Sequence, residues 1–504
     1  MNARRRHGCE FDRHDARGHS VLIDLEQRDL LDGMPVAAGV RSPFQANDIA
    51  QADFVALTGK VTQWQRMRAL AREFRARGKT VLIGGPYASL CPDEVRPHCD
   101  ILFRGEAETT AARLFSDLAT GRWRSEYCGS PPDLAQSPAP RWDLYPTRRA
   151  VLGTVQTSRG CPFECEFCDV IQYLGRRQRH KPIPKVVAEL DELYRLGFRQ
   201  VFLADDNFTV HRSRAKELLA RLRDWNRERS GDCVTFITQV SIDAARDEEL
   251  LTLCREAGLH RVFIGIESPN DQSLREAKKR QNLRVDLATD IGCFVDHGIA
   301  VTAGMIVGFD ADGPDIFARQ LEFAMPLPVP IFTIGALVAP PATPLHARLR
   351  DSGRLVGDGS EVAATPFSTN VVPNRMSRAT LLAGLRQLCR SLYAPAAFAS
   401  RLSRLAERIE GTPRPGRGAG APVPSSRNTR EVELDTLRLI KQLPRLGAAE
   451  TLLWNDARAI LARRPSAAEF VLPALLQYIQ IRYMFARTGV WTEDAQGRSS
   501  GLHA

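Results

Sequence analysis

Short apolar runs alternate with amphipathic stretches in the first part of the chain, and this alternation predicts a parallel β-sheet. The runs at 21–23, 54–57 and 81–83 have the length and composition of buried strands. Between the last two runs, apolar residues recur at helical spacing from Met67 to Phe74. Strands that alternate with helices need crossover connections, which places this region in the α/β class.

The alternation becomes more regular from Val151 onward. Further strands are predicted at 151–158, 201–204, 234–240, 262–266, 301–307 and 331–338. Eight strand–helix units close a full barrel, so these six predict a partial barrel. Binding and catalytic residues of parallel barrels lie at the C-terminal ends of the strands, and candidate site residues are therefore expected there.

Two stretches of biased composition separate these regions. One is rich in proline, which stiffens a linker, and the other is a basic stretch of glycine and proline, which predicts a flexible linker. The predicted organisation is a disordered N-terminus (1–19), a Rossmann-like domain (20–128), a proline-rich linker (129–147), a barrel (148–345), a helical extension (346–410), a flexible linker (411–430) and a helical C-terminal region (431–490).

The composition is that of an ordinary soluble protein, with 43% hydrophobic and 25% charged residues among 504. The eleven cysteines are scattered along the chain, and their only tight group is one triplet. This pattern argues against a disulfide framework and predicts a reducing, cytoplasmic location. No secretory signal follows Arg4–Arg6, and no apolar stretch is long enough to span a bilayer.

The net charge of +10 favours anionic partners such as a membrane surface or phosphate groups, or else reflects an arginine-rich solvated surface. No nucleic-acid partner is expected. The predicted helix at 467–487 has few charges, so it either lies on a membrane surface or packs on the barrel.

The cysteine triplet is Cys161, Cys165 and Cys168, spaced C-x3-C-x2-C directly after a predicted strand. Thiolates select iron–sulfur clusters, zinc or copper(I). A structural zinc site needs four ligands, and the following segment offers His180 alone. Three thiolates suit a [4Fe–4S] cluster whose fourth iron stays open, because each iron takes one outer ligand. Zinc remains an alternative.

The segment Arg159–Asp169 resembles the signature of the radical S-adenosylmethionine (SAM) superfamily. The resemblance implies that the open iron binds the amino and carboxylate groups of SAM, and that an electron from the cluster releases a 5′-deoxyadenosyl radical. It also implies that Phe167 shields the cluster, although a simple loop-packing role is an equal alternative.

The same resemblance assigns residues at the strand ends to SAM. Those expected to hold its amino group, ribose and adenine are Asp205, Asp206, Asn207, Glu267, Gly304, Ile306 and Gly308, with Gln239 and Ser241 as weaker candidates in the same cavity. Some of these residues also have an ordinary structural explanation. Asp206 or Asn207 can cap the following helix, and glycines are common where a buried strand meets a turn.

A glycine turn, Gly84-Gly85-Pro86, follows a predicted strand of the first domain and lets a ligand approach the backbone. With the segment Ile101–Glu108 it resembles the cobalamin-binding domain that precedes many radical SAM barrels. The first strand–helix unit of that family and its Asp-x-His-x-x-Gly motif are missing here, so a degenerate packing domain is the alternative. The segment Ala339–Leu345 resembles the loop that closes the active site in cobalamin-linked members.

Taken together, the chain resembles the cobalamin-dependent radical SAM subfamily that includes hopanoid C-2 methyltransferases, through Cys165–Asp169, Asp205–Phe208 and Phe263–Glu267. The resemblance implies methylation of an unreactive carbon in a small molecule or a lipid, with a reductant such as flavodoxin or ferredoxin. The basic run Arg176–Lys181 either receives such an acidic donor or is a solvated loop. A cobalamin-independent radical enzyme and a non-catalytic iron–sulfur protein remain as alternatives.

Overall fold

The computed structural model describes residues 20–24, 52–142, 150, 152–229, 232–283, 285–357, 359–363, 367–409, 434 and 436–491. The predicted disordered N-terminus (1–19) and flexible linker (411–430) lie outside the described residues. The chain divides into two compact units. The first contains 1–150, 158–196 and 338–370, and the second contains 151–157, 197–337 and 371–504.

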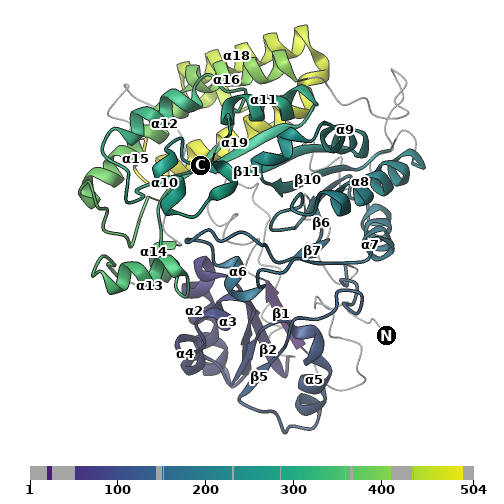
Figure 1. The fold of residues 1–504 in the computed structure, drawn as a ribbon. Coiled ribbons are helices and arrows are strands. Elements are labelled where there is room, and N and C mark those ends of the chain that lie inside the picture. Colours follow the sequence, from purple (N-terminus) through teal and green to yellow (C-terminus); the bar gives the residue numbers. More distant parts are fainter. Residues whose placement is uncertain are drawn as a thin grey trace. The chain divides into compact units, whose positions relative to one another are not determined.

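The first unit is built on a five-stranded parallel sheet whose strands follow one another in chain order (Figure 1). They are β1 (Ser20–Asp24), β2 (Phe54–Thr58), β3 (Thr80–Gly84), β4 (Ile101–Arg104) and β5 (Glu126–Cys128). The strands predicted at 21–23, 54–57 and 81–83 are therefore confirmed. The short strand β5 was not predicted, because only Tyr127 in it is buried.

Alternating side chains give this sheet two apolar faces. Val55, Val81 and Ile83 face α2 (Trp64–Ala76), whose buried residues are those of the predicted helical stripe together with Trp64. Leu82 and Phe103 point the other way, towards α5 (Ala111–Ala119). Figure 1 shows α2, α3 (Gly85–Leu90) and α4 (Pro92–Val95) on one face and α5 on the other. Covering both faces is what a parallel sheet requires.

Later parts of the chain join the first unit. A two-stranded antiparallel ladder pairs β7 (Ser158–Arg159) with β8 (Arg179–His180). The helices are α6 (Val170–Tyr173), α7 (Ile183–Arg195), α13 (Pro344–Asp351) and α14 (Gly359–Ala363). Helix α14 packs on α2, and Gln65 Nε2 donates a hydrogen bond to Ser360 Oγ at 3.1 Å.

The second unit contains a six-stranded parallel sheet in the order β13-β12-β11-β10-β9-β6. The strands are β6 (Gly153–Val155), β9 (Gln200–Leu203), β10 (Thr235–Val240), β11 (Leu259–Glu267), β12 (Ala300–Val307) and β13 (Phe332–Ala336). All six predicted strands are present, which confirms the partial-barrel fold. The first is shorter than predicted and ends at Val155.

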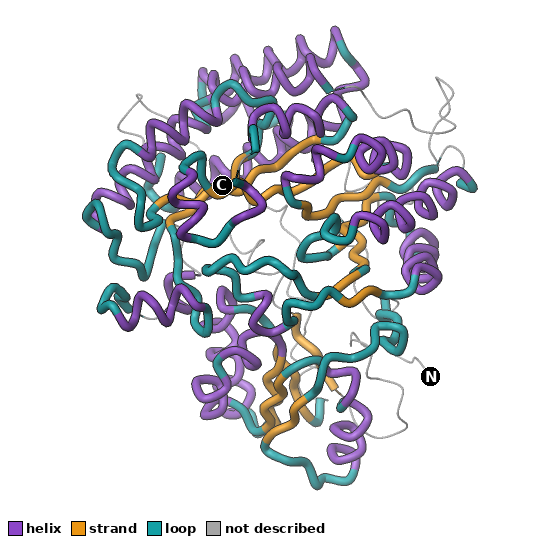
Figure 2. Tube along the Cα trace, viewed as in Figure 1, coloured by secondary structure: helices purple, strands orange, loops and turns teal. Residues whose placement is uncertain are grey.

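The two faces of this sheet have different environments. Val262 and Ile264 are fully buried, and the Phe236 ring lies 6.5 Å from that of Trp225 on α8 (Arg212–Arg227), so these side chains face the helices. Helices α9 (Glu248–Ala257), α11 (Leu287–Asp296) and α12 (Ile316–Ala324) follow the later strands (Figure 2). The opposite face, here called the inner face, carries partly exposed side chains such as Ile237 and Phe263.

Helices complete the second unit: α10 (Asp271–Glu276), α15 (Arg378–Leu392), α16 (Pro395–Arg408), α18 (Ala448–Arg463) and α19 (Ala468–Arg487). The Tyr393 hydroxyl donates to Phe332 O at 2.6 Å and accepts from Phe332 N at 2.9 Å, so both backbone groups of Phe332 at the start of β13 have a hydrogen-bond partner. The predicted helix at 467–487 is confirmed as α19, and its apolar side is packed, with the Tyr478 ring 4.7 Å from Phe398. Among the described residues, no helix has the length and apolarity needed to cross a membrane.

Candidate active site

The three cysteines lie in a hairpin, residues 158–180, that is closed at its base by the β7–β8 ladder. Gly160 has φ +93°, and a Cβ there would come within 2.7 Å of Arg177 O, so this turn requires glycine. Cys161 N donates to Gly175 O at 3.3 Å across the hairpin. The sequence following the predicted first strand therefore folds into a closed loop that presents all three thiols.

Two glutamates after β4 hold the base of this cysteine hairpin. Glu106 binds both paired arginines, with Oε2 2.6 Å from Arg159 Nη1 and Oε1 2.6 Å from Arg179 Nη2. Glu108 Oε1 lies 2.6 Å from the same Arg159 nitrogen. Burial works against the charge of Arg159, but its hydrogen bonds and ion pairs with both glutamates outweigh this and raise its pKa. We call these four residues the glutamate clamp.

The basic run 176–181 is thus partly structural. Arg179 belongs to the glutamate clamp, and Lys181 Nζ forms a buried ion pair with Glu189 Oε1 at 2.6 Å. Arg176 is exposed and pairs with the exposed Glu164 at 2.8 Å. The interpretation of the whole run as a solvated loop is therefore wrong for Arg179 and Lys181.

The thiols have the donor chemistry of an iron–sulfur site. Cys165 is buried, and Cys168 N donates to Cys165 O at 3.1 Å in a tight turn. Burial raises the pKa of the Cys168 thiol to about 12. Within the described part of the chain, no three His, Cys, Asp or Glu side chains converge on a single metal ion. The donor set itself fits a [4Fe–4S] cluster, because three thiolates can each bind one iron and leave the fourth iron open.

The segment after β13 contacts the cysteine hairpin within the first unit. Arg348 of α13 forms a bidentate pair with Glu166, at 2.7 and 3.0 Å, and Leu345 N donates to Glu166 O at 3.1 Å. Bidentate pairs of this kind fix orientation as well as adding energy. The predicted closing loop 339–345 is therefore tied to Glu166, one of the two residues between the second and third cysteines. Phe167 next to it is half-buried, and its shielding role stays a prediction.

The glycine turn of the first sheet lies close to the same hairpin. β3 ends at Gly84, and Gly85 has φ +85° and begins α3, with Pro86 in its first turn. A Cβ on Gly85 would overlap Thr58 Oγ1, so packing against β2 already explains this glycine. Helix α3 contacts α6, which begins just after Asp169. The assignment of Gly84, Gly85 and Pro86 to cobalamin stays a prediction.

In the second unit, the ends of β9 and β10 come together. The Asp205 carboxylate is buried and accepts from the amide of Thr157 at 2.7 Å and from its hydroxyl. Asn207 Nδ2 donates to Ser241 Oγ at 2.8 Å. Helix α8 has His211 at its N-cap position, with no capping hydrogen bond from that side chain, so capping of this helix by Asp206 or Asn207 is wrong.

Gln239 continues this strand-end group. Its carbonyl accepts from Phe208 N at 2.9 Å, and its side chain is partly exposed on the inner face. The structure thus places Asn207, Gln239 and Ser241 together at the C-terminal ends of neighbouring strands, where the sequence predicted them.

Glu267 ends β11 in an uncommon conformation. Its φ of 65° is rare for a residue other than glycine, and the β11–β12 register shifts between Gly265 and Glu267. The carboxylate lies 2.9 Å from Lys279 Nζ, and Asn282 Nδ2 donates to the carbonyls of Gly265 and Ile266 at 2.9 and 2.8 Å. Backbone strain of this kind concentrates at functional sites, which supports the prediction made for Glu267.

The loop after β12 is organised by a residue that the sequence reasoning missed. The buried Asp312 accepts from Gly308 N at 2.9 Å, Phe309 N at 3.0 Å and Ser273 Oγ at 2.6 Å. Burial raises its pKa, although these hydrogen bonds oppose the shift. Upstream, Gly304 makes room for the Phe263 ring. Asp312 lies four residues after Gly308, and this position was the sequence signal that could have identified it.

Ile306 also takes part in this arrangement through its backbone. Its carbonyl accepts a 2.8 Å hydrogen bond from Gln320 Nε2 of α12. The same amide approaches Glu267 O at 3.5 Å, so Gln320 links the ends of β11 and β12.

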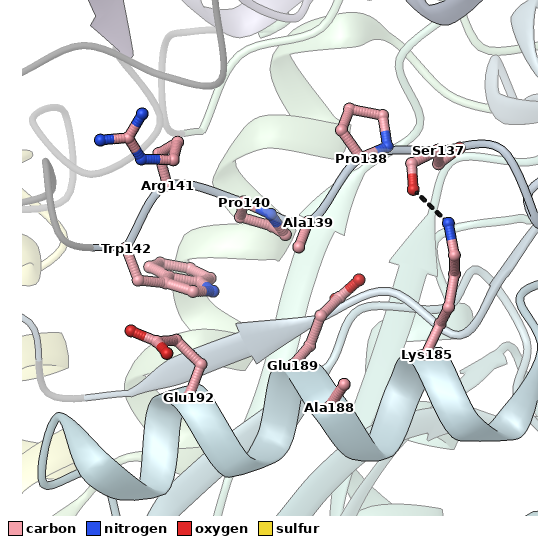
Figure 3. A pocket seen from close by; sticks show the side chains of 10 residues that line it. All are labelled: Ser137, Pro138, Ala139, Pro140, Arg141, Trp142, Lys185, Ala188, Glu189 and Glu192. Carbon is pink, nitrogen blue, oxygen red and sulfur yellow. Dashed lines mark hydrogen bonds between the residues drawn. The ribbon is translucent and has the colours of Figure 1, made fainter. Parts of the chain in front are cut away.

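A cavity of ≈ 830 Å³ lies in the first unit between the proline-rich segment 137–142 and α7 (Figure 3). Lys185 Nζ donates to Ser137 O at 2.9 Å across it, and Glu189 and Glu192 also point from α7 towards the segment. None of the residues predicted to bind the cluster, SAM or cobalamin lines this cavity.

Residues 155–319 match the radical SAM superfamily, and residues 343–487 match a domain of unknown function (DUF4070). An uncharacterised methyltransferase of Synechocystis sp. is 36% identical over 64% of this chain and 61% of its own length. The hopanoid C-2 methylase of Rhodopseudomonas palustris is 33% identical over 64% of this chain and 62% of its own length. The chain thus spans about three fifths of these relatives.

Solved structures of the radical SAM methyltransferase TsrM from Kitasatospora setae share the fold. One, with tryptophan and a SAM analogue bound, has a TM-score of 0.54 at 17% identity, covering 84% of this chain and 90% of TsrM. Another contains cobalamin and a [4Fe–4S] cluster, with a TM-score of 0.53. Residues 155–319 therefore belong to the radical SAM superfamily, and they lie within a chain that shares its fold with TsrM.

Proposed function

We propose that this protein is a cobalamin-dependent radical SAM enzyme that methylates an unreactive carbon. The observation that carries the proposal is the closed hairpin that presents Cys161, Cys165 and Cys168, within the residues that match the radical SAM superfamily. The relatives named as methyltransferases support the reaction class. Bound together, a [4Fe–4S] cluster, SAM and cobalamin supply one-electron cleavage of SAM and a transferable methyl group.

The residues of this chain have separate tasks in that scheme. The three cysteines hold the cluster, and the glutamate clamp fixes the base of their hairpin. In the second unit, Asn207 and Ser241 offer amide and hydroxyl groups to SAM, and Glu267 offers a carboxylate to its ribose. The segment from Gly304 to Gly308 offers its backbone to the adenine ring of SAM.

The substrate is a small molecule or a lipid, and a hopanoid is one candidate because a hopanoid C-2 methylase is among the relatives. A small acidic redox protein such as flavodoxin or ferredoxin serves as the reductant, in the cytoplasm. A lipid substrate would require contact with a membrane surface, which the net charge of +10 favours.

A second candidate is a radical SAM enzyme that works without cobalamin. Among the described strands, the first sheet runs in chain order from β1 to β5, with no reversal of strand order. Ligands of doubly wound sheets bind where the order reverses, so this sheet lacks the usual binding crevice in its described part.

Anaerobic incubation of the full chain with hydroxocobalamin and methyl-labelled SAM tests both candidates. A methylated product together with a corrin absorption spectrum retained through gel filtration supports the first. Release of 5′-deoxyadenosine with no retained corrin and no label transfer supports the second and contradicts the first. Absence of 5′-deoxyadenosine after dithionite reduction contradicts both and leaves a non-catalytic iron–sulfur protein.

A further inference from the structure

The carboxylate of Glu267 lies on the inner face of the six-stranded sheet, folded back over its own strand. A Cβ on Gly265 would overlap Glu267 Oε1 and come within 3.0 Å of Lys279 Nζ, so the carboxylate and the ammonium both occupy the space above this glycine. Gly265 shares the face of Phe263, because side chains alternate along β11. The Glu267–Lys279 ion pair, at 2.9 Å, therefore lies at the C-terminal end of β11, where the ribose contact is proposed.

The backbone around Glu267 is held by two buried amide side chains. Asn282, which is 2% exposed, donates through Nδ2 to the carbonyls of Gly265 and Ile266 at 2.9 and 2.8 Å. Gln320 of α12 is fully buried, and its Nε2 lies 3.5 Å from Glu267 O. Three successive carbonyls at the end of β11 thus have side-chain donors, which fix the turn in which the φ of Glu267 is 65°.

Lys279 and Asn282 reach Glu267 from one short segment that follows α10. The helix ends with Lys278 at φ 55°, and Lys279 N donates to Leu274 O at 2.9 Å, which closes the turn. A side chain at positive φ destabilises the fold, and glycine usually takes this place at the end of a helix. Among the described residues, four other than glycine have positive φ, and Glu267 and Lys278 are two of them. Strain on both sides of one contact favours a functional role for that contact.

We propose that Lys279 and Asn282 are positioning residues that orient the Glu267 carboxylate towards the ribose hydroxyls of SAM. This rests on the proposed function, in which Glu267 binds the ribose. The ion pair uses Glu267 Oε1, and a carboxylate accepts hydrogen bonds through both oxygens, so acceptor capacity remains for a hydroxyl. Hydrogen bonds to an ionised acceptor are stronger than those between neutral groups. A correctly oriented carboxylate therefore distinguishes a ribose from a deoxyribose.

A purely structural role of the ion pair has a different consequence. If Lys279 and Asn282 only stabilised the end of β11, their removal would weaken the binding of every SAM analogue to the same extent. If they orient Glu267, their removal weakens the binding only of ligands that carry the ribose hydroxyl. Comparison of SAM with its 2′-deoxy and 3′-deoxy analogues separates the two roles.

The test measures the dissociation constants of SAM, 2′-deoxy-SAM and 3′-deoxy-SAM by competition dialysis against labelled SAM. The full-length protein is reconstituted anaerobically and kept oxidised, so that SAM binds without being cleaved. We expect wild type to bind SAM about 10–100-fold more tightly than the weaker of the two analogues. In Lys279→Met and in Asn282→Ala this preference should fall to about 1–3-fold, through loss of affinity for SAM alone, and Lys279→Arg should keep part of it.

Lys278→Met is the matched control, because it removes an exposed lysine next to Lys279 and leaves the ion pair in place. It should bind all three ligands as wild type does. Melting temperatures, measured before reconstitution, identify a variant that does not fold, and the preference is then read from the other one. An equal loss of affinity for SAM and both analogues, or a preference that survives in Lys279→Met and Asn282→Ala, overturns the proposal.

Failure of the proposal is distinct from failure of the proposed function. A wild type that binds SAM and both analogues equally overturns the positioning role, whereas the proposed function stands if reduction with dithionite still releases 5′-deoxyadenosine. A wild type that does not bind SAM contradicts both.

Discussion

Replacing Glu106 by glutamine should loosen the cysteine hairpin. The Glu106 side chain is 8% exposed and accepts from Arg159 at 2.6 Å and from Arg179 at 2.6 and 3.1 Å. Removing one partner of a buried ion pair costs about 3–5 kcal/mol. Arg159 keeps Glu108, and Arg179 keeps the carbonyls of Pro132 and Leu174, so we expect the lower end, about 3 kcal/mol.

Glu126 offers a matched control for this substitution. It also pairs with two arginines, Arg96 at 2.8 Å and Arg104 at 3.2 Å, but its side chain is 30% exposed. Exposed pairs contribute about 0–1 kcal/mol, so Glu126→Gln should have a small effect.

Urea unfolding of the apoprotein and iron and sulfide content after anaerobic reconstitution measure the two consequences. Glu106→Gln should lower both the unfolding midpoint and the cluster content, and Glu106→Asp should restore part of each. Equal midpoints and equal iron content in Glu106→Gln and Glu126→Gln would refute the reasoning, since the clamp would then contribute nothing beyond a surface pair.

Three further substitutions test other parts of the structure. Gly85→Ala should lower the free energy of unfolding by more than about 1 kcal/mol, because the added Cβ meets Thr58. Gly121→Ala is also at positive φ but in open space, and it should lower the free energy of unfolding by about 1 kcal/mol. Similar urea midpoints for the two variants would be inconsistent with this. Tyr393→Phe should cost about 1–3 kcal/mol, because the backbone of β13 loses its partner, and an unchanged melting temperature would argue against that role. Burial of Glu108 favours its neutral form, but the charge of Arg159 outweighs this and lowers its pKa. Wild type should therefore have a higher free energy of unfolding than Glu108→Gln. This difference should be largest above about pH 4.3 and should decrease as the pH falls through the lowered pKa of Glu108; a difference independent of pH would contradict this.

The sheets were predictable because their strands are local apolar runs, and the six strands of the partial barrel lie where the hydrophobic pattern predicted them. The first strand shows the limit of that pattern. Thr157 has strand-like neighbours, yet its amide donates to the Asp205 carboxylate and not to the sheet. A side chain 48 positions away decides where this strand ends, and no local pattern reports such a contact.

The candidate site was predictable in its residues but not in its supports. Cys161, Cys165 and Cys168 lie within eight residues of sequence, so their spacing was informative. The contacts that hold their hairpin join residues far apart: Glu106 is 73 positions from Arg179, and Glu166 is 182 from Arg348. Charged residues at those separations have many possible partners, and only the folded chain selects among them.

The C-terminal helix illustrates a different limit. A helix with an apolar side and few charges can lie on a membrane or pack against protein, because both bury the same surface. In α19, Phe470, Tyr478 and Phe485 are buried within the second unit. The packing alternative is therefore confirmed for these side chains.

The central claim is that three cysteines hold a cubane whose fourth iron is open to SAM. Electron paramagnetic resonance of the anaerobically reconstituted, dithionite-reduced protein, recorded with and without SAM, tests it most directly. The account predicts about four iron and four sulfide per chain, a reduced-cluster signal that SAM changes, and loss of that signal in the Cys161→Ala, Cys165→Ala, Cys168→Ala triple variant. A cluster signal that SAM leaves unchanged, or one that survives in the triple variant, would contradict it.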